Sequence, residues 1–402
     1  MRTRNTAVCL SLALLATSCA GSLDRTVRAE WLHEGGPPTA IPMDVLPSNH
    51  IYVPGVIAGQ ETELLVDTGA GITVLDNQFA RKLNLKRFRA VTASGVGGTV
   101  TGSYVRVPSI RVGDLILRNV LAIAINLSPI ARIVEHDIPV ILGKEFFKSA
   151  VVEIDYPRSL LVCHRREGFR YKGDGRTVPL RSSSSGLKKV RCQIEDLPSA
   201  WFQLDTGSGR SVSVFQEYAA RHGILEGRTP RSTRIGGGVG GFATESVASM
   251  RKFTFAGFDL HEVPANFPTP DTGAFVNKPY AGNLGGGILR RFHLWIDFDR
   301  NRMHVEAGPK IHVPFDRDRL GLVTLVRGRA LVVLHASPGS PAEKAGIRRG
   351  AKLVRVDDHP GSPDQLRKLL RDASRRPDGA TVRIRDAEGK DHRITLATHY
   401  KP

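Results

Sequence analysis

The sequence contains little cysteine and no recognisable metal-binding pattern. Four cysteines occur in 402 residues, and Cys9 and Cys19 both lie within the first twenty. Cys163 and Cys192 alone are too few for a disulfide framework or a zinc site of the Cys-x-x-Cys type, and whether they pair with each other stays open. The 13 histidines show no spacing of the His-Glu-x-x-His kind. We therefore expect no metal and no cofactor.

Long apolar runs and clustered charge are also missing. No apolar run beyond residue 20 reaches the roughly 18 residues that a membrane-spanning helix needs. The formal net charge is +18, but the basic residues are dispersed and form no stripe with interleaved aromatics, so we expect no nucleic-acid partner. With 41% hydrophobic and 24% charged residues, the chain has the composition of a globular protein, and its length predicts two or three domains.

Residues 1–20 have the features of an export signal. Arg2 and Arg4 precede a short apolar run that ends in small residues, which is typical of a secretory signal peptide. Two cleavage sites compete. Residues 16–19 resemble a bacterial lipobox, with a lipid on Cys19 that attaches the protein to a membrane, whereas residues 18–20 fit an ordinary signal peptidase. Both alternatives predict an exported protein of the periplasm.

One segment of the chain occurs twice. The sequence TELLVDTGAGITVL at 62–75 matches FQLDTGSGRSVSVF at 202–215, because both contain an apolar strand, Asp-Thr-Gly, a small residue, Gly and a second apolar strand. Four further landmarks return in the same order at a nearly constant offset, among them "VGG" at 96–98 and 239–241. This pattern indicates a tandem duplication of one unit.

Each copy is predicted to be mainly β. Short β-branched or aromatic runs alternate with Gly, Pro or Asn, and a short helix is expected after each repeated segment, at 77–85 and 215–224. We expect the two copies to form lobes at 38–166 and 176–308. The Gly-rich and charged stretch between them is the predicted joint.

The tail at 310–400 differs in character. Ser340 and Ser362 are predicted helix N-caps, since each is followed by Pro and, three residues after the cap, by Glu or Gln. The second predicted helix places Leu366 on an apolar face. Strand-like segments surround both helices, so we expect a separate small α+β domain.

The repeated Asp-Thr-Gly points to chemistry. A single copy would more often be a turn, but two copies in a duplicated framework assemble about a pseudo-two-fold axis that brings Asp67 and Asp205 together. Two carboxyl groups a few ångströms apart share one proton. One then activates a water molecule while the other, protonated, donates to a carbonyl oxygen. The sequence does not assign these two roles.

The neighbouring residues are predicted to support this pair. The glycines allow a tight backbone turn beneath each carboxyl group, and the threonines can interlock at the axis. Ser208 has a hydroxyl that can donate to a carboxylate, whereas Ala70 has none, so the two halves are not equivalent here. The predicted supporting residues are Thr68, Gly69, Ala70, Thr206, Gly207 and Ser208.

Over about residues 40–308 the chain resembles the retropepsin-like aspartic peptidases, the family of retroviral proteases, here fused into one chain as in pepsin. The resemblance rests on the paired Asp-Thr-Gly-[Ala/Ser] and on an apolar-Gly element at 141–143 and 283–285. It implies two β-barrel lobes related by pseudo-two-fold symmetry, a peptide or unfolded protein as substrate, and a monomer. Lys144 and Gly286 depart from the family, where retroviral enzymes usually have Arg.

The same resemblance implies a Gly-rich hairpin flap in each lobe that closes over the substrate. These flaps lack the aromatic residue of pepsin-type flaps. The residues that correspond to them are Gly95, Val96, Gly97, Gly98, Gly238, Val239, Gly240 and Gly241.

The tail resembles a PDZ domain of the bacterial type, through SPAEKAGIRRGAKLVRVDD at 340–358. This resemblance implies that Leu320, Gly321 and Leu322 form a loop that binds the C-terminal carboxylate of a peptide, and that the helix bearing Leu366 walls the groove. Ordinary core positions are an equally good interpretation of Leu320 and Leu322.

Together these features predict an exported bacterial aspartic endopeptidase with a PDZ domain that recruits or regulates. A non-catalytic peptide-binding or scaffold protein of the periplasm, which uses the same cleft and groove, is the alternative. A homodimer that pairs equivalent repeats between chains is unneeded, because one chain carries both halves.

Overall fold

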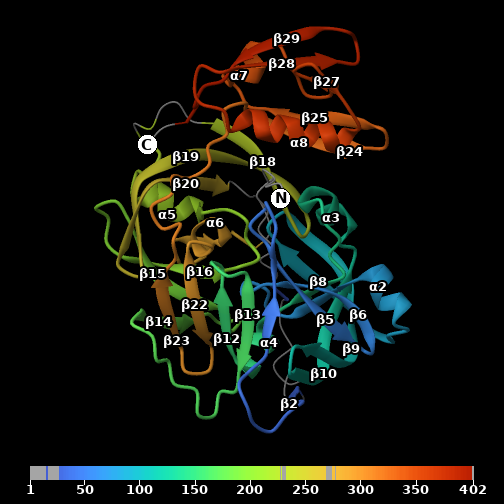
Figure 1. Ribbon diagram of the computed structural model, residues 1–402, viewed down its shortest axis with the longest axis vertical. Coiled ribbons are helices and arrows are strands. Elements are labelled where there is room, and N and C mark those ends of the chain that lie inside the picture. The colour runs from blue at the N-terminus through green and yellow to red at the C-terminus, as the bar shows by residue number, and fades with distance from the viewer. Residues whose placement is uncertain are drawn as a thin grey trace.

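The computed structural model describes residues 15–16, 27–226, 228, 232–268, 274–276 and 278–400. In this part the chain is mainly β, as predicted, and its strands form three sheets (Figure 1). Cys19 and the rest of the predicted signal segment lie outside the described residues, except for β1 (Leu15–Ala16), which pairs with β8. None of the helices in the described part is both long enough and apolar enough to cross a membrane.

The first sheet closes on itself. Strands β9, β10, β7, β11, β6 and β5 are hydrogen-bonded in this order, and β5 pairs back with β9, which makes a barrel. The elements of this half are β2 (Arg28–Trp31), β4 (Asp44–Val45), β5 (Ile51–Ile57), β6 (Gln60–Val66), β7 (Thr73–Asp76), α2 (Asn77–Lys82), β8 (Arg87–Gly95), β9 (Gly98–Val112), β10 (Leu115–Ile125), α3 (Ser128–Val134), β11 (Val140–Leu142) and α4 (Lys144–Ser149).

The second sheet contains another closed barrel. Here β19, β20, β17, β21, β16 and β15 follow one another, and β15 pairs back with β19. Its elements are β3 (Ala40–Pro42), β12 (Val151–Asp155), β13 (Leu160–His164), β14 (Arg176–Ser182), β15 (Lys188–Ile194), β16 (Ala200–Asp205), β17 (Val212–Val214), α5 (Gln216–Arg221), β18 (Ser232–Gly238), β19 (Gly241–Phe255), β20 (Phe258–Pro268), β21 (Gly282–Gly285), α6 (Gly286–Leu289), β22 (Phe292–Asp297) and β23 (Arg302–Ala307).

The two halves of the chain share one sheet below the barrels. Strand β12 pairs antiparallel with β22, so β13 and β3 extend the sheet on one side and β23 and β14 on the other. Closed barrels leave few unpaired edges. Apolar residues from both barrels and from this shared sheet form one large core, and further apolar residues of the first barrel form a second cluster.

Local sequence explains where the short helices begin and end. The side chain of Asp76 caps α2 by accepting a hydrogen bond from Gln78 N at 2.7 Å. The helix is shorter than predicted because Asn84 adopts a positive φ of 52°, which no helical residue has. Likewise α5 covers only part of the predicted 215–224, since Gly223 has a φ of 57°.

The C-terminal unit, β24 to β29 with α7 and α8, forms the third sheet. Ser362 makes the full capping box with Gln365, whereas at Ser340 the cap accepts from Glu343 N and the Glu343 carboxylate binds Gly339 N instead of the cap backbone. The elements are β24 (Leu322–Arg327), β25 (Ala330–Ala336), α7 (Pro341–Lys344), β26 (Lys352–Val356), β27 (His359–Pro360), α8 (Pro363–Ser374), β28 (Thr381–Asp386) and β29 (Asp391–Thr395).

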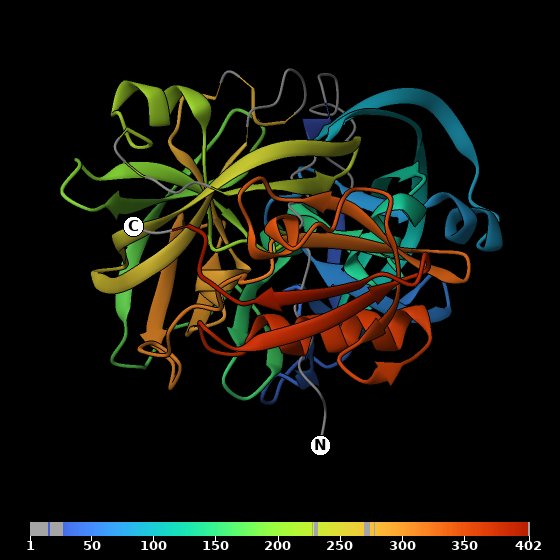
Figure 2. The ribbon, with the colours of Figure 1, turned by 90° about the horizontal axis from the view of Figure 1, so that it is seen from above.

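The C-terminal unit lies on the side of the barrels where β18 and β19 run (Figure 1), and Figure 2 shows it from above.

At the opposite side of the barrels, the shared sheet carries Cys163. Cys163 and Cys192 are both buried free thiols, and burial raises the pKa of both well above the ordinary thiol value. They do not form a disulfide.

Candidate active site

The two repeated aspartates meet between the barrels. Asp67 follows β6 directly, and Asp205 is the last residue of β16. Strands β11 and β21 lie beside β6 and β16 in parallel, and Asp67 N donates to Leu142 O at 3.1 Å. Both aspartates are fully buried, and each lies close enough to the other to shift its pKa. The structure therefore brings the two predicted carboxyl groups together.

Two threonines lock the loops that carry these carboxyl groups. Thr68 N donates to Thr206 Oγ1, and Thr206 N donates to Thr68 Oγ1, both at 3.0 Å. Each hydroxyl also donates across to a carbonyl of the other half, that of Thr68 to Leu204 O and that of Thr206 to Val66 O, both at 2.9 Å. The reciprocal pattern fixes the separation of the two loops without any flexible side chain.

The two glycines leave room for the opposite carboxyl group. A Cβ on Gly69 would lie 2.5 Å from Asp205 Oδ1, and a Cβ on Gly207 would overlap the carboxyl group of Asp67. Gly69 N also donates to Asp67 Oδ1 at 2.7 Å. Glycine is therefore needed here for close approach rather than for a left-handed backbone.

Burial controls the electrostatics of the pair. Loss of solvent, followed by the nearby charge of Asp205, raises the pKa of Asp67 well above its ordinary value. Burial also raises the pKa of Asp205 to about 7, although Asp67, Arg210 and Asn283 each act to lower it. Two carboxyl groups that resist ionisation together hold one proton between them over a range of pH.

Asn283, which is not among the residues predicted from the sequence, distinguishes the two aspartates. Its Nδ2 donates to Asp205 Oδ2 at 2.7 Å, and its own Oδ1 has no hydrogen-bond partner among the described residues. The corresponding residue in the other apolar-Gly element is Ile141, which has no donor. The two apolar-Gly elements, 141–143 and 283–285, differ at this first position, and that difference was the sequence signal for a polar residue beside Asp205 alone. The predicted donation from the Ser208 hydroxyl stays a prediction.

A buried ion pair lies behind Asp205. Arg210 Nη2 is 2.7 Å from Glu245 Oε2, and both side chains are almost fully buried. Asn266 Nδ2 donates to Glu245 Oε1 at 2.8 Å. In the first repeat Ile72 occupies the position of Arg210. Polar side chains therefore surround Asp205 in the second half, whereas apolar side chains take the corresponding positions near Asp67. A negative charge is for this reason better stabilised on Asp205 than on Asp67.

The two Gly-rich hairpins meet at their tips. Their tips lie at residues 95–98 and 238–241, where β8 turns into β9 and β18 into β19. Gly97 N donates to Val239 O at 3.0 Å. Val239 is buried among apolar residues of the first half, and Val96 packs beside Phe215 of the second. Each hairpin tip thus inserts a valine into the other half.

The predicted loop of the C-terminal unit lies beside a cavity at the junction with the barrels. Leu320, Leu322 and Leu370 line this cavity of about 180 Å³. Leu320 and Leu366 are both buried in the core of the C-terminal unit. On α8 the lining leucine is Leu370, which also packs in that core, rather than the predicted Leu366 one turn before it.

A cluster of potential metal ligands lies in the shared sheet, far along the chain from the aspartate loops. Ligand atoms of Glu153, Asp155 and His293 lie within 4.8 Å of one another. They already form ion pairs, because Glu153 contacts His164 and His293, and Asp155 contacts Arg158. Those contacts account for the grouping of these side chains without a metal ion.

Part of the chain is similar to a known family. A family model described as aspartyl protease matches residues 53–146. The matched segment contains Asp67, the hairpin of β8 and β9 and the apolar-Gly element at 141–143, whereas Asp205 lies outside it. A comparison with curated proteins found no match. The family match supports a protease activity, in agreement with the meeting of the two carboxyl groups.

Proposed function

We propose that the protein is an exported bacterial aspartic endopeptidase that hydrolyses a peptide or an unfolded protein. The observation that carries the proposal is the pair of fully buried carboxyl groups, Asp67 and Asp205, in one threonine-locked frame. Such a pair shares a proton and can activate water directly. In this account the reaction forms no acyl-enzyme and needs no cofactor.

A tandem duplication accounts for the two barrels. In support, both barrels close through equivalent pairings, and both contain an Asp-Thr-Gly loop, a short helix, a Gly-rich hairpin and an apolar-Gly element in the same order. We place the lobes at 38–166 and 176–308 and relate them by a pseudo-two-fold axis through the threonine lock. One chain then supplies a complete site as a monomer.

The environments of the two aspartates suggest separate roles. Asp205, which receives a hydrogen bond from Asn283 and lies near Arg210, is the ionised partner and accepts a proton from water. Asp67, in the apolar half, holds the proton and donates it to the carbonyl oxygen as the water oxygen attacks the carbonyl carbon. The proton on Asp205 then passes to the leaving nitrogen, and Asp67 regains its proton from the gem-diol when the C–N bond breaks.

Substrate entry requires the hairpins to separate. The tips are hydrogen-bonded to each other and bury Val96 and Val239, and both aspartates are closed off from solvent. Opening of such lids often contributes to turnover. A closed site also excludes bulk water, which strengthens the hydrogen bonds that act on the transition state.

The C-terminal unit is proposed to be a PDZ domain at 310–400 that recruits or regulates. Support comes from its edge strand β24, its helix α8 and the loop of Leu320, Gly321 and Leu322 between the barrels and β24. An extended peptide can add to such an edge strand. Export to the periplasm, with or without a lipid on Cys19, completes the proposal.

The test is hydrolysis of a reduced and alkylated protein by the purified chain, across acidic to neutral pH. The double variant Asp67→Asn/Asp205→Asn keeps the shape of both side chains and serves as the control. We expect peptide products from the natural chain and none from the double variant. Equal hydrolysis by both would refute the proposal, and tight substrate binding without cleavage would favour the non-catalytic peptide-binding alternative.

A further inference from the structure

Another cavity lies on the side of the barrels away from the C-terminal unit. Its volume is about 750 Å³, and it is lined by residues of the segments 31–39 and 163–173 together with Asp114 and Trp295. Strand β2, which ends at Trp31, lies at the end of the molecule opposite the C-terminal unit (Figure 1). The second of these segments contains most of the stretch that joins the two lobes. A volume of this size is typical of pockets that hold small ligands.

Four aromatic rings line this cavity, and two of them belong to tryptophans, of which the chain has three. The half-buried rings are those of Trp31, Phe169, Tyr171 and Trp295. Tyr171 and Trp295 have ring centroids 4.9 Å apart, and the Tyr171 hydroxyl donates to Glu306 Oε1 at 2.5 Å and accepts from Gly175 N at 2.7 Å. The guanidinium of Arg165 lies 4.8 Å from the ring centre of Trp31. These contacts fix the rings in place, so the apolar surface of the cavity is preformed. We call it the aromatic cavity.

Two cations of the lining make no ion pair in the part of the chain that the structure describes. They are Arg170 and Lys172, and both side chains are exposed. The acidic residues of the lining are already engaged, because Glu167 lies 3.9 Å from Arg166 Nη2 and Asp114 Oδ2 accepts a hydrogen bond from Thr39 N at 3.1 Å. The aromatic cavity therefore favours a ligand with negative charge.

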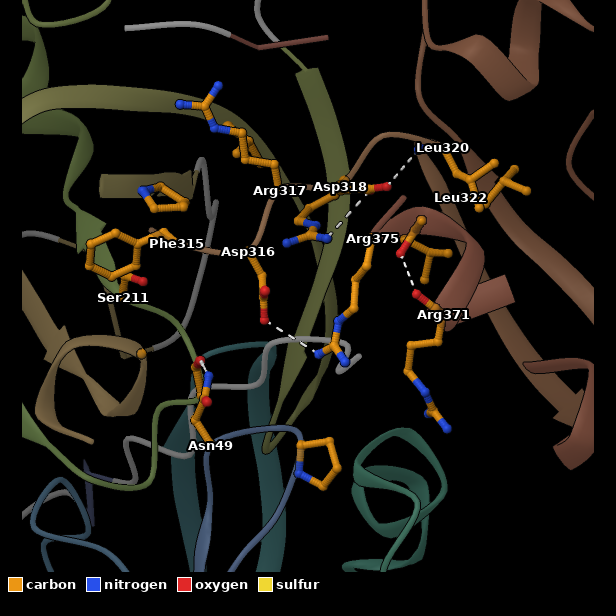
Figure 3. A pocket seen from close by; sticks show the side chains of 18 of the residues that line it. Asn49, Ser211, Phe315, Asp316, Arg317, Asp318, Leu320, Leu322, Arg371 and Arg375 are labelled. Carbon is orange, nitrogen blue, oxygen red and sulfur yellow. Dashed lines mark hydrogen bonds and ion pairs between the residues drawn. The ribbon is translucent and has the colours of Figure 1, made fainter. Parts of the chain in front are cut away.

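The cavity at the junction with the C-terminal unit differs in this respect. Its arginines bind carboxylates of the chain itself, since Arg371 Nη1 lies 3.0 Å from Glu135 Oε2 and Arg375 Nη2 lies 3.3 Å from Asp316 Oδ2. Figure 3 shows the second of these ion pairs across the junction cavity. The charges there hold the C-terminal unit against the barrels, whereas those of Arg170 and Lys172 are available to a ligand.

The neighbouring backbone argues against a peptide added as a strand. Strand β3 ends the order of the shared sheet beside the aromatic cavity, but Pro37 and Pro38 precede it and Pro42 is its last residue. Proline has no N–H to donate to a ladder, and Thr39 N is already bonded to Asp114. Two available cations are also too few for a nucleic acid, which has a charge on every nucleotide.

We propose that the aromatic cavity binds an acidic saccharide. A pyranose ring has a face of C–H bonds that packs on aromatic rings, and hydroxyl groups at its edge that bind polar side chains and backbone. The carboxylate of a uronic acid then pairs with Arg170 and Lys172. None of the lining residues belongs to the Asp-Thr-Gly loops, so this binding does not depend on the proposed peptidase function. The site attaches the protein to an acidic polysaccharide.

Binding is tested by titration calorimetry of the full-length chain with tetragalacturonic acid and with its methyl ester, which differs only in charge. We expect the acid to bind more tightly. The double variant Arg170→Ala/Lys172→Ala should weaken binding of the acid by at least about threefold, as expected for two exposed ion pairs, and should leave binding of the ester unchanged. Both side chains are exposed, so the fold should be retained.

Lys86 and Arg89 provide a matched control. They are exposed and lie outside the lining of the aromatic cavity. Lys86→Ala/Arg89→Ala removes the same two charges and should leave binding of the acid unchanged. Equal binding of acid and ester by the natural chain, or an equal loss in the two double variants, would overturn the proposal.

The role of the rings is tested separately. Phe169→Ala should weaken binding of acid and ester alike, by about threefold to tenfold, because packing on a ring does not depend on charge. Binding should also change the tryptophan fluorescence of the natural chain. Trp201→Phe should keep this change, since Trp201 lies outside the lining, whereas Trp295→Phe should reduce it.

The remaining outcomes refute the proposal. If neither saccharide binds at millimolar concentration, the cavity is not a saccharide site. If an oligothymidylate of the same charge binds more tightly than tetragalacturonic acid, its ligand is a nucleic acid. A fluorescence change that is lost in Trp201→Phe and kept in Trp295→Phe would place the saccharide elsewhere.

Discussion

Replacement of Asn283 by isoleucine should shift the acidic limb of the pH–rate profile upward. The Nδ2 of Asn283 donates to Asp205 Oδ2 at 2.7 Å in a buried site. This donor favours the charged form of Asp205, so its loss raises the pKa of Asp205 further. The ionised form that accepts the proton from water then exists only at higher pH, and the rate falls at pH values where the natural chain is active.

The size of this shift follows from the strength of the bond. A hydrogen bond to a charged group contributes about 1.5–3 kcal/mol, and one pKa unit corresponds to about 1.4 kcal/mol, so the limb should move by about 1–2 pH units. Isoleucine is the residue at the corresponding position 141 of the first half. Because Asn283 Oδ1 has no described partner, the replacement also removes a buried unpaired acceptor, and the fold should tolerate it.

The assay is kcat/KM against pH with a dye-quenched unfolded protein. Ser213→Ala is the control, because Ser213 lies opposite Asn283 in the sheet and its hydroxyl has no described hydrogen-bond partner. The control should leave the acidic limb in place. An unchanged limb in Asn283→Ile, or a limb that moves to lower pH, would refute the assignment of the charge to Asp205.

Three further changes have definite expected outcomes. Thr206→Val leaves a buried N–H and a buried carbonyl without partners, so the free energy of unfolding should fall by about 2–5 kcal/mol in a urea titration. Gly69→Ala places a methyl group against Asp205 and should abolish hydrolysis, measured as kcat, while circular dichroism still reports a β fold. Glu245→Gln removes one charge of the buried pair with Arg210 and should lower the free energy of unfolding by about 3–5 kcal/mol, read in the same titration.

Each of these changes has a conservative counterpart. Thr206→Ser keeps the hydroxyl and should retain most of the stability. Gly35→Ala adds a methyl group where no atom lies within 4 Å, and should leave hydrolysis unchanged. Glu245→Asp keeps the charge and should lose less stability than Glu245→Gln. If a conservative variant loses as much stability or activity as the disruptive variant at the matching test, the named contact is not the cause of that loss.

The parts of the site that the sequence predicted are those encoded locally and repeated. The Asp-Thr-Gly turns, the Gly-rich hairpin tips and the caps at Ser340 and Ser362 each depend on a few adjacent residues, and repetition reinforced the first two. The mainly β fold followed from short β-branched runs. Helix lengths were overestimated, because Asn84 and Gly223 end the helices through positive φ angles rather than through the composition of the segment.

The parts that the sequence did not predict depend on pairing between distant segments. Asn283 reaches Asp205 only because β21 lies parallel to β16 with Gln203 opposite Asn283. Arg210 pairs with Glu245 of the long strand β19 because closure of the barrel brings the two segments together. The contact of Asp318 with Arg234 of β18 requires the C-terminal unit to dock on the second hairpin, and no local pattern specifies such docking.

The central claim is that Asp67 and Asp205 of one chain form a single site. It is tested most directly by measuring hydrolysis by Asp67→Asn and Asp205→Asn separately, without removal of any species larger than a monomer. The account predicts that both single variants lose activity to the background level, because each destroys the same pair. Substantial activity in either variant would contradict it, since a site built from equivalent aspartates of two chains would survive in one of them.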